Sequence, residues 1–399
     1  MSQPNAPRAM DEDSPSPAGD TDAIPLAQPA LSDVERGYVQ DVLHSARLAQ
    51  GPWRDRFEAA MAKQCGSMHA VATNSGTAAL HLILAALDIG PGDEVITTPF
   101  SFIASANVIL YVGATPRFVD IEPATFNLDV DRVDAAITPA TRAILAVDVF
   151  GAPADWPALR RLADTHDLLL IDDACEALGA RIDGRPAGSW GDAAAFGFYP
   201  NKQITTGEGG CITTDDPTWA RHCRSLRNQG RADDGVMQHT QLGYNYRMDE
   251  LAAALGCAQL ERLPELLSQR AAVARRYHDA LAPLAEDLHR PTLSSGAVDR
   301  SWFVYVIRLR DRFADGARDQ LMAALRERGI GCAPYFPAIP LQPYYRDRFG
   351  FQPGTFPICE STADRTLALP FYPDLTLAQI HRVADALGTI LPRLPRMTQ

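Results

Sequence analysis

Lysine is almost absent from this chain. Of its 37 lysine and arginine residues only Lys63 and Lys202 are lysines, which leaves 35 arginines. Codon bias in an alanine-rich sequence accounts for such a shortage, and it makes each surviving lysine more informative. A guanidinium replaces an ammonium as a charge but forms no Schiff base, whereas a lysine amine does. Lys202, in "GFYPNKQITTGEGG", is therefore a candidate for chemistry, with chance survival as the alternative.

Long apolar runs and paired cysteines are missing as well. No stretch approaches the ~20 apolar residues of a membrane helix, and the N-terminus has no basic-then-apolar signal pattern. The seven cysteines are scattered and never form a C-x-x-C pair, which favours reduced thiols over disulfides or a zinc site. A net charge of −12 disfavours nucleic acid and anionic membranes as partners. These absences predict a cytoplasmic protein with no metal site that binds neither nucleic acid nor membrane.

The 399 residues are enough for more than one hydrophobic core. Residues 1–23 are rich in proline, serine and aspartate, which predicts a disordered tail. Over residues 24–285 short apolar strands alternate with amphipathic helices, and this α/β pattern predicts a mostly parallel sheet between helices. The pattern changes after residue 285, so we expect a smaller α+β domain over residues 286–399.

Local signals define the helices at both ends of the predicted large domain. Ser32 followed by Glu35 is a capping box, which predicts a helix that starts just after Ser32. A helical pattern runs from about Met248 to Leu281, and Pro264 inside it predicts a kink.

Three polar features follow predicted strands, where open α/β sheets bind their ligands. Ser75-Gly76-Thr77 starts a helix and suits a phosphate, although the same turn is also an ordinary helix entry. Asp173 ends the apolar strand "LLLIDD" and needs a partner, either an arginine or a protonated pyridine nitrogen. Lys202 lies in a loop between two predicted strands. A lysine, an aspartate and a phosphate-binding helix start are together what pyridoxal 5'-phosphate (PLP) requires.

The chain resembles the DegT/DnrJ/EryC1/StrS family of PLP-dependent sugar aminotransferases in the segments "SGTAALHL", "GPGDEVITTPFSF", "IDDACEALGA", "GDAAAFGFYPNKQITTGEGG" and "GYNYRMDELAAAL". The resemblance runs from about Ile24 to the C-terminus. It implies the PLP-dependent transferase fold type I of aspartate aminotransferase. In that fold a large domain holds a mostly parallel mixed sheet between helices, and a smaller α+β domain follows.

The resemblance also assigns roles to individual residues. Lys202 would form the internal aldimine and move protons, and Asp173 would keep the pyridine nitrogen protonated. The other assignments are contacts to PLP, namely Gly76 and Thr77 on the phosphate, Phe102 stacked on the ring, Glu176 on the ring oxygen, and Asn245 on the phosphate from the neighbouring subunit. A core phenylalanine is the alternative for Phe102. The role of Asn245 makes a homodimer with shared active sites part of the prediction.

Two positions depart from the family pattern. Gly197 stands where many relatives have a serine on the phosphate. Pro340, in "YFPAIPLQPYY", stands near the acceptor entrance where relatives often have histidine. The lysine at position 202 argues for transamination, because dehydratase relatives carry histidine there.

The implied function is an aminotransferase that moves the amino group of L-glutamate to a nucleotide-linked keto-sugar by a ping-pong aldimine mechanism. A ketocyclitol aminotransferase acting on an inosose-type ring is an alternative with the same fold. A non-catalytic PLP-fold sensor is another alternative, although such regulators usually carry a helix-turn-helix or a membrane segment. Both kinds of acceptor ring are compatible with this sequence.

Overall fold

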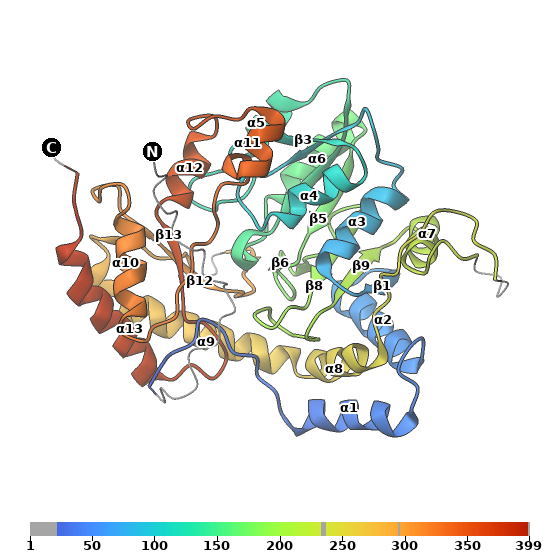
Figure 1. The fold of residues 1–399 in the computed structure, drawn as a ribbon, viewed down its shortest axis with the longest axis horizontal. Coiled ribbons are helices and arrows are strands. Elements are labelled where there is room, and N and C mark those ends of the chain that lie inside the picture. The colour runs from blue at the N-terminus through green and yellow to red at the C-terminus, as the bar shows by residue number, and fades with distance from the viewer. Residues whose placement is uncertain (1–21, 233–236, 294–295, 398–399) are drawn as a thin grey trace, which may run out of the picture.

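A seven-stranded sheet forms the centre of the computed structural model (Figure 1), which describes residues 22–232, 237–293 and 296–397. Of the predicted disordered tail, all but residues 22 and 23 lie outside these ranges. Across the sheet, the strands are β1 (His69–Thr73), β9 (Gly210–Thr214), β8 (Ala193–Gly197), β5 (Leu169–Asp173), β4 (Thr141–Val147), β2 (Glu94–Thr97) and β3 (Thr115–Phe118). Only β9 runs antiparallel to its neighbours within this sheet. The predicted mostly parallel mixed sheet is confirmed.

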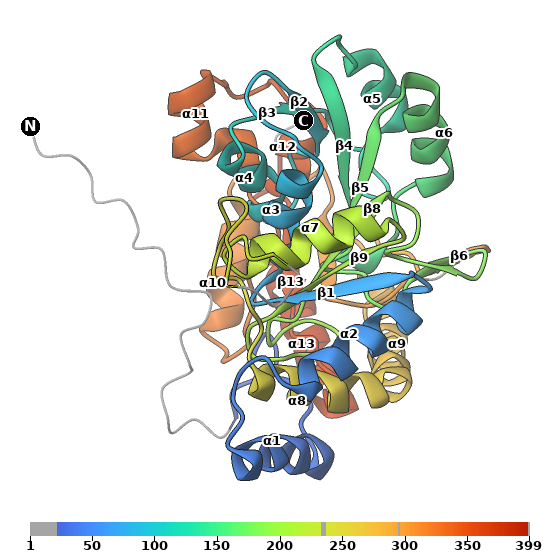
Figure 2. The ribbon, with the colours of Figure 1, turned by 90° about the vertical axis from the view of Figure 1, so that its right-hand side faces the viewer.

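Helices cover both faces of this sheet (Figure 2). Alternate residues of each strand point to opposite faces, so Leu145 and Ile171 join one core and Ala146 and Leu170 join another. The first face is covered by α3 (Gly76–Ala86), α4 (Ala104–Tyr111) and α7 (Pro217–Arg227). The second face is covered by α2 (Pro52–Cys65), α5 (Val130–Ala136), α6 (Trp156–His166) and α8 (Glu250–Glu261).

The predicted site residues meet at one edge of the sheet because parallel strands end there together. β1 ends at Thr73 just before α3, β5 ends at Asp173, and β8 ends at Gly197 shortly before Lys202. The antiparallel strand β9 starts at the same edge, since Gly210 pairs with both Thr73 and Gly197. The topology alone therefore places the helix start, the aspartate and the lysine loop beside one another.

A second, antiparallel sheet follows in the C-terminal part. Its strands are β10 (Leu288–His289), β12 (Tyr305–Leu309) and β13 (Thr366–Leu369). The helices α9 (Leu263–Ala280), α10 (Ala317–Arg326) and α13 (Leu377–Ile390) share a hydrophobic core with this sheet. A short ribbon joins β6 (Arg181–Ile182), β7 (Arg185–Pro186) and β11 (Val298–Asp299). No helix in the described ranges is both long and apolar enough to cross a membrane.

Two C-terminal helices pack on the large sheet instead of the small one. They are α11 (Pro343–Phe349) and α12 (Pro357–Ala363), and they lie near β3 and α4 (Figure 1). The ring of Tyr345 lies 5.7 Å from that of Phe118, and Asp120 Oδ1 accepts a hydrogen bond from Cys359 N at 2.8 Å. Part of the C-terminal region thus packs against the large sheet. A domain boundary at 285/286 stays a prediction.

The predicted helix from Met248 to Leu281 is two helices that meet at Arg262. Pro264 lies in the first turn of α9, where a missing N–H costs no helical hydrogen bond. Within α9, Leu266 belongs to a core under the large sheet and Tyr277 belongs to the core of the small sheet. One uninterrupted helix therefore takes part in both cores.

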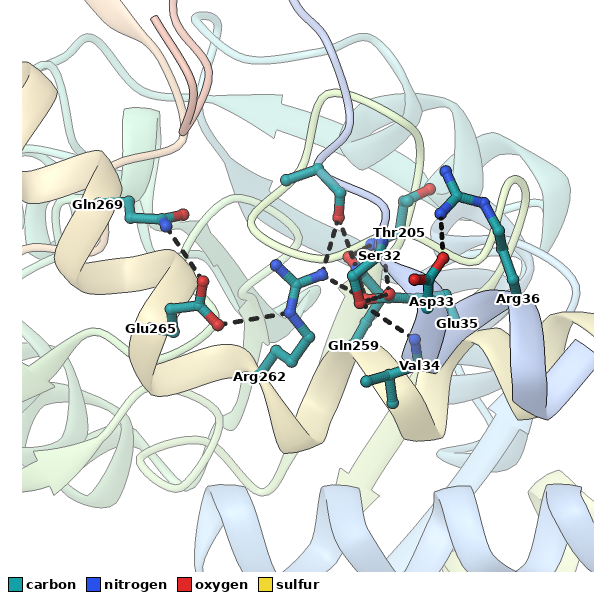
Figure 3. Close-up of polar contacts among 11 residues, drawn as sticks. Ser32, Asp33, Val34, Glu35, Arg36, Thr205, Gln259, Arg262, Glu265 and Gln269 are labelled. Carbon is teal, nitrogen blue, oxygen red and sulfur yellow. Dashed lines mark hydrogen bonds and ion pairs between the residues drawn. The ribbon is translucent and has the colours of Figure 1, made fainter.

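The first helix, α1 (Asp33–Ser45), begins at the predicted capping box and is tied to the bend between α8 and α9 (Figure 3). Glu35 is buried, and its Oε1 accepts hydrogen bonds from Arg262 Nη1 at 2.7 Å and from Gln259 Nε2 at 2.6 Å. Gln259 Oε1 in turn accepts from Thr205 N at 3.2 Å, in the loop that follows Lys202. The network thus connects the N-terminal helix to the lysine loop.

Replacement of Glu35 by glutamine is expected to destabilise the protein in a pH-dependent way. Burial raises the pKa of the Glu35 carboxyl, but hydrogen bonds from Ser32, Arg262 and Gln259 outweigh it and lower the pKa from 4.5 to about 2. Because the folded state has the lower pKa, the carboxylate stabilises the fold above pH 4.5, and this contribution is lost as the pH falls toward 2. We expect Glu35→Gln to lower the free energy of unfolding by about 2 kcal/mol at pH 7, measured by urea unfolding.

The exposed Asp33, near Glu35 in the first turn of the same helix, provides the matched control. Asp33→Asn is expected to change the free energy of unfolding by less than about 0.5 kcal/mol. A loss in Glu35→Gln that stays the same from pH 7 to pH 3 would show that the charge of Glu35 contributes nothing.

Candidate active site

The amine of Lys202 lies between a carboxylate and an aromatic ring. Its Nζ is 3.7 Å from Glu176 Oε1 and 3.9 Å from the centre of the Phe303 ring, and the side chain is 14% exposed. The backbone is held too, since Lys202 O accepts a hydrogen bond from Arg270 Nη2 at 2.7 Å. Lys202 is therefore fixed at both ends and partly withdrawn from water.

Glu176 is held in place by backbone groups around it. Its Oε2 accepts from Phe150 N at 2.8 Å, and its own carbonyl accepts from Gln203 Nε2. Burial raises the pKa of the Glu176 carboxyl, while the charge of Lys202 and the Phe150 N–H partly offset that rise. The structure thus places Glu176 beside the lysine amine, and its contact with the PLP ring oxygen stays a prediction.

Asp173 is a buried carboxylate at the end of β5. Its Oδ2 accepts from Ser105 Oγ at 2.7 Å, and its Oδ1 accepts from Cys175 N at 3.2 Å. Within the described ranges, no lysine or arginine forms an ion pair with it. A carboxylate that is fixed by neutral donors and lacks a cation suits a protonated ring nitrogen, so this residue fits PLP.

Phe102 lies in the loop that is tied to Asp173. Ser105 Oγ, the donor to Asp173, also lies 3.3 Å from Phe102 O. The Phe102 side chain is 57% exposed, which excludes the alternative of a core phenylalanine. The ring is therefore available to stack on a ligand held by Asp173. Sequence reasoning missed Ser105, which lies three residues after Phe102 in the first turn of α4.

The start of α3 packs directly against Cys175, which lies two residues after Asp173 in the chain. Ser75 caps the helix, since its Oγ accepts from Ala78 N at 3.1 Å. A Cβ atom on Gly76 would lie only 2.8 Å from Cys175 Sγ and 3.2 Å from Gly197 Cα. Glycine is therefore required at position 76, and the N–H groups of a capped helix of eleven residues open next to Asp173. Such a helix start fits the phosphate of PLP.

Gly197 lies beside Cys175. A Cβ atom on Gly197 would lie 3.4 Å from Cys175 Sγ and 3.6 Å from Cys175 Cβ, which are ordinary packing distances. The contact leaves room for a side-chain carbon at position 197, so nothing in the structure explains the glycine there. Burial raises the pKa of the Cys175 thiol well above 9.0, so it is a neutral packing group rather than a nucleophile. Sequence reasoning missed this pairing because the two residues are distant in the chain.

Asn245 is exposed, and backbone contacts within its own chain hold it next to the start of α3. It forms an isolated bridge with Asn228, and the carbonyl of the following residue, Tyr246, accepts from Asn74 N at 3.0 Å. Asn74 directly precedes the Ser75 cap. The structure therefore places Asn245 close to the start of α3, and a contact to the partner subunit's cofactor stays a prediction.

Two more carboxyls are buried on the opposite face of the same strands. Asp148 Oδ1 accepts from Trp156 Nε1 at 2.7 Å, and Asp172 Oδ2 accepts from Gly188 N at 2.8 Å. Within the described residues, the other oxygen of each carboxyl has no hydrogen-bond partner. Burial, followed by the repulsion of Asp148, raises the pKa of Asp172 well above 3.8. Burial and the nearby Asp148 therefore both favour the protonated form of Asp172.

Replacement of Asp148 by asparagine is expected to remove a pH-dependent loss of folding stability. Chiefly through burial, the pKa of Asp148 rises from 3.8 to about 7. The folded state therefore binds a proton that the unfolded state has released, and stability falls as the pH rises from 3.8 to 7. The asparagine amide keeps the acceptor oxygen and has no proton to release, so we expect Asp148→Asn to gain about 1 kcal/mol or more relative to wild type between pH 4 and pH 8.

The measurement is urea unfolding of both proteins across this pH range. Asp164→Asn, at an exposed position on α6, is the control and should run parallel to wild type. Parallel curves for Asp148→Asn and wild type would contradict a proton on the buried pair.

The fold and this set of residues define a PLP-dependent aminotransferase of fold type I. Solved relatives agree, and one is a putative sugar aminotransferase from Streptococcus pneumoniae, Spr1654, known in its PMP and PLP forms. Its PMP form has a TM-score of 0.88 and 28% identity, over 93% of this chain and 99% of that one. DesV of S. venezuelae, solved in complex with a ketimine intermediate, has a TM-score of 0.84 and 38% identity, over 90% of this chain and 95% of that one.

The sequence comparisons narrow this class to one family. The model of the DegT/DnrJ/EryC1/StrS aminotransferase family matches residues 29–388. GDP-perosamine synthase of Caulobacter vibrioides is 41% identical over 373 residues, which are 93% of this chain and 99% of that protein. The chain belongs to the DegT/DnrJ/EryC1/StrS aminotransferase family. The predicted family, fold, enzyme class and cofactor are thereby confirmed.

Proposed function

We propose that this sugar aminotransferase moves the amino group of L-glutamate to a keto-sugar linked to a nucleoside diphosphate. The observation that carries the proposal is a buried lysine amine, 3.7 Å from Glu176, at the sheet edge that also holds Asp173 and the start of α3. The acceptor class is supported by the relative named GDP-perosamine synthase, which this chain matches over 99% of its length.

The residues of this chain divide the work between holding the cofactor and moving a proton. When bound, PLP supplies a carbonyl carbon that takes up amines and a ring that draws electrons from the substrate. Asp173 would keep a proton on the ring nitrogen, and the N–H groups at Gly76 and Thr77 would hold the phosphate. Lys202 Nζ, once displaced by the donor, would remove the proton from the donor α-carbon. Glu176 and the Phe303 ring keep that amine in position.

A homodimer with shared sites is part of the proposal. Tyr111 on α4 and Leu242, near Asn245 in the chain, both expose large apolar surfaces. The ring of His81 connects these regions, at 5.5 Å from the ring of Tyr111 and 4.7 Å from that of Tyr244. Exposed apolar surface next to a ligand site suits a second subunit. Asn245, exposed beside this cluster, would then reach the phosphate of the partner subunit.

A complementation experiment tests the shared site. Each active site would combine Lys202 of one subunit with Asn245 of the other. Lys202→Ala removes the first of these residues, and Asn245→Ala removes the second. Unfolding and refolding an equal mixture of the two inactive variants should restore about one quarter of wild-type activity, because half of the dimers are mixed and carry one intact site. No recovery in verified mixed dimers would place Asn245 at the site of its own chain.

Lys202 itself is tested by trapping and by turnover. Borohydride treatment of the yellow protein is expected to fix the cofactor on Lys202, because only this lysine lies at the sheet edge with Asp173. Lys202→Ala is expected to lower glutamate-dependent amination by about 10³-fold or more. Turnover is measured with a panel of GDP-, UDP- and dTDP-linked keto-sugars and an inosose.

Lys63→Ala, at an exposed position on α2, is the matched control and should label and turn over like wild type. Turnover by Lys202→Ala would contradict the role of the lysine. Turnover of the inosose alone would replace the nucleotide-linked acceptor by a ketocyclitol and leave the lysine assignment intact.

A further inference from the structure

Arg270 is a buried cation with no carboxylate partner among the described residues. It is 2% exposed, and its guanidinium contacts backbone carbonyls. Nη1 donates to Phe303 O at 3.1 Å, and Nη2 donates to Lys202 O at 2.7 Å and lies 3.5 Å from Asn201 O. Within the same described part of the chain, Nε has no hydrogen-bond partner. Burial lowers the pKa of Arg270 from 12.5 to about 10, so the group is still charged at neutral pH.

Arg227, the other buried arginine among the described residues, has a carboxylate partner, since it pairs with Glu58 at 2.5 Å. The partly buried Arg262 pairs with Glu35 at 2.7 Å. Apart from its backbone carbonyls, Arg270 Cζ lies 5.7 Å from the centre of the Phe371 ring. A charge held by dipoles and a ring costs stability, because its desolvation is only partly repaid. An apolar side chain would fill the same space without that cost. The reason for an arginine at position 270 is therefore to be found in the carbonyls it contacts.

These carbonyls belong to the two segments that surround the lysine amine. Asn201 and Lys202 are in the lysine loop, and Phe303 precedes the small-sheet strand β12. The Phe303 ring is the surface against which Lys202 Nζ rests, at 3.9 Å. One planar guanidinium thus fixes both the loop that carries the amine and the ring that the amine contacts.

The place of Arg270 in its helix fits this function. It lies on α9 between Leu266, which packs under the large sheet, and Val273, which packs in the core of the small sheet. The helix is held on both sides, so the guanidinium is a fixed reference for the lysine loop. Gln259 on α8 provides a second anchor through its bond from Thr205 N.

We propose that Arg270 is a positioning residue for Lys202, which sets the location of the amine through the carbonyls of Lys202 and Phe303. The inference depends on Lys202 being the lysine that receives the cofactor, as proposed above. Arginine is needed because its rigid fork reaches carbonyls on two segments at once, whereas a lysine ammonium is a single point of donation.

The test measures how fast the apo-protein captures added PLP on Lys202. Samples are quenched with borohydride at intervals, and the labelled lysine is identified by peptide mapping. Arg270→Met removes charge and fork, and is expected to slow capture by about tenfold to a hundredfold, as displaced reacting groups do. Arg270→Lys keeps the charge but loses the fork, and should lie between Arg270→Met and wild type.

Arg310 provides the control, because its guanidinium also donates to a backbone carbonyl, in this case that of Ala285 alone, away from the lysine loop. Arg310→Met should capture PLP at the wild-type rate, whatever its thermal unfolding temperature. Wild-type capture rates in Arg270→Met, with only a lower unfolding temperature, would reduce Arg270 to a structural role. Should Arg270→Met fail to fold, a wild-type rate in Arg270→Lys would overturn the proposal equally. Absence of label on Lys202 in the wild-type protein would instead overturn the lysine assignment.

Discussion

The site is organised around the buried carboxylate of Asp173, which needs a counter-charge. None of the described lysines and arginines forms an ion pair with it. Neutral donors, Ser105 Oγ and Cys175 N, fix its two oxygens and leave its charge uncompensated. Burial raises the pKa of the neighbouring Asp172 well above 3.8, which favours its protonated form. Arg270, a buried cation on α9, is bound to carbonyls instead. Asp173 is thus a carboxylate that suits a protonated ring nitrogen.

Local patterns were enough to predict the frame of this site. The capping box at Ser32 and Glu35, the alternation of strands and helices, and the strand that ends in Asp173 each depend on neighbours in sequence. Parallel strands bring their carboxyl ends together whatever the loops contain, so the convergence of Asp173, Lys202 and the start of α3 followed from topology. The family resemblance then supplied the cofactor.

Contacts between segments that are distant in sequence could not be predicted. Nothing around Ser105 shows that its hydroxyl reaches Asp173, and nothing around Arg270 shows that its guanidinium reaches the carbonyl of Lys202. The contact between Gly197 and Cys175 joins two strand ends and is not visible in either local pattern. The charge states of Asp148 and Asp172 depend on burial and on each other, which a sequence does not display.

The shared helix α9 restricts how the molecule can open and close. Its first half is packed under the large sheet and its second half in the small core, so neither lobe can swing away without bending a helix or opening a core. The packing of α11 and α12 against the large sheet adds to this restraint. Access for a bulky acceptor must therefore come from movement of surface loops rather than from a hinge between lobes. In such an enzyme, selectivity for new sugars can change by loop substitution while the amine-transfer machinery stays rigid.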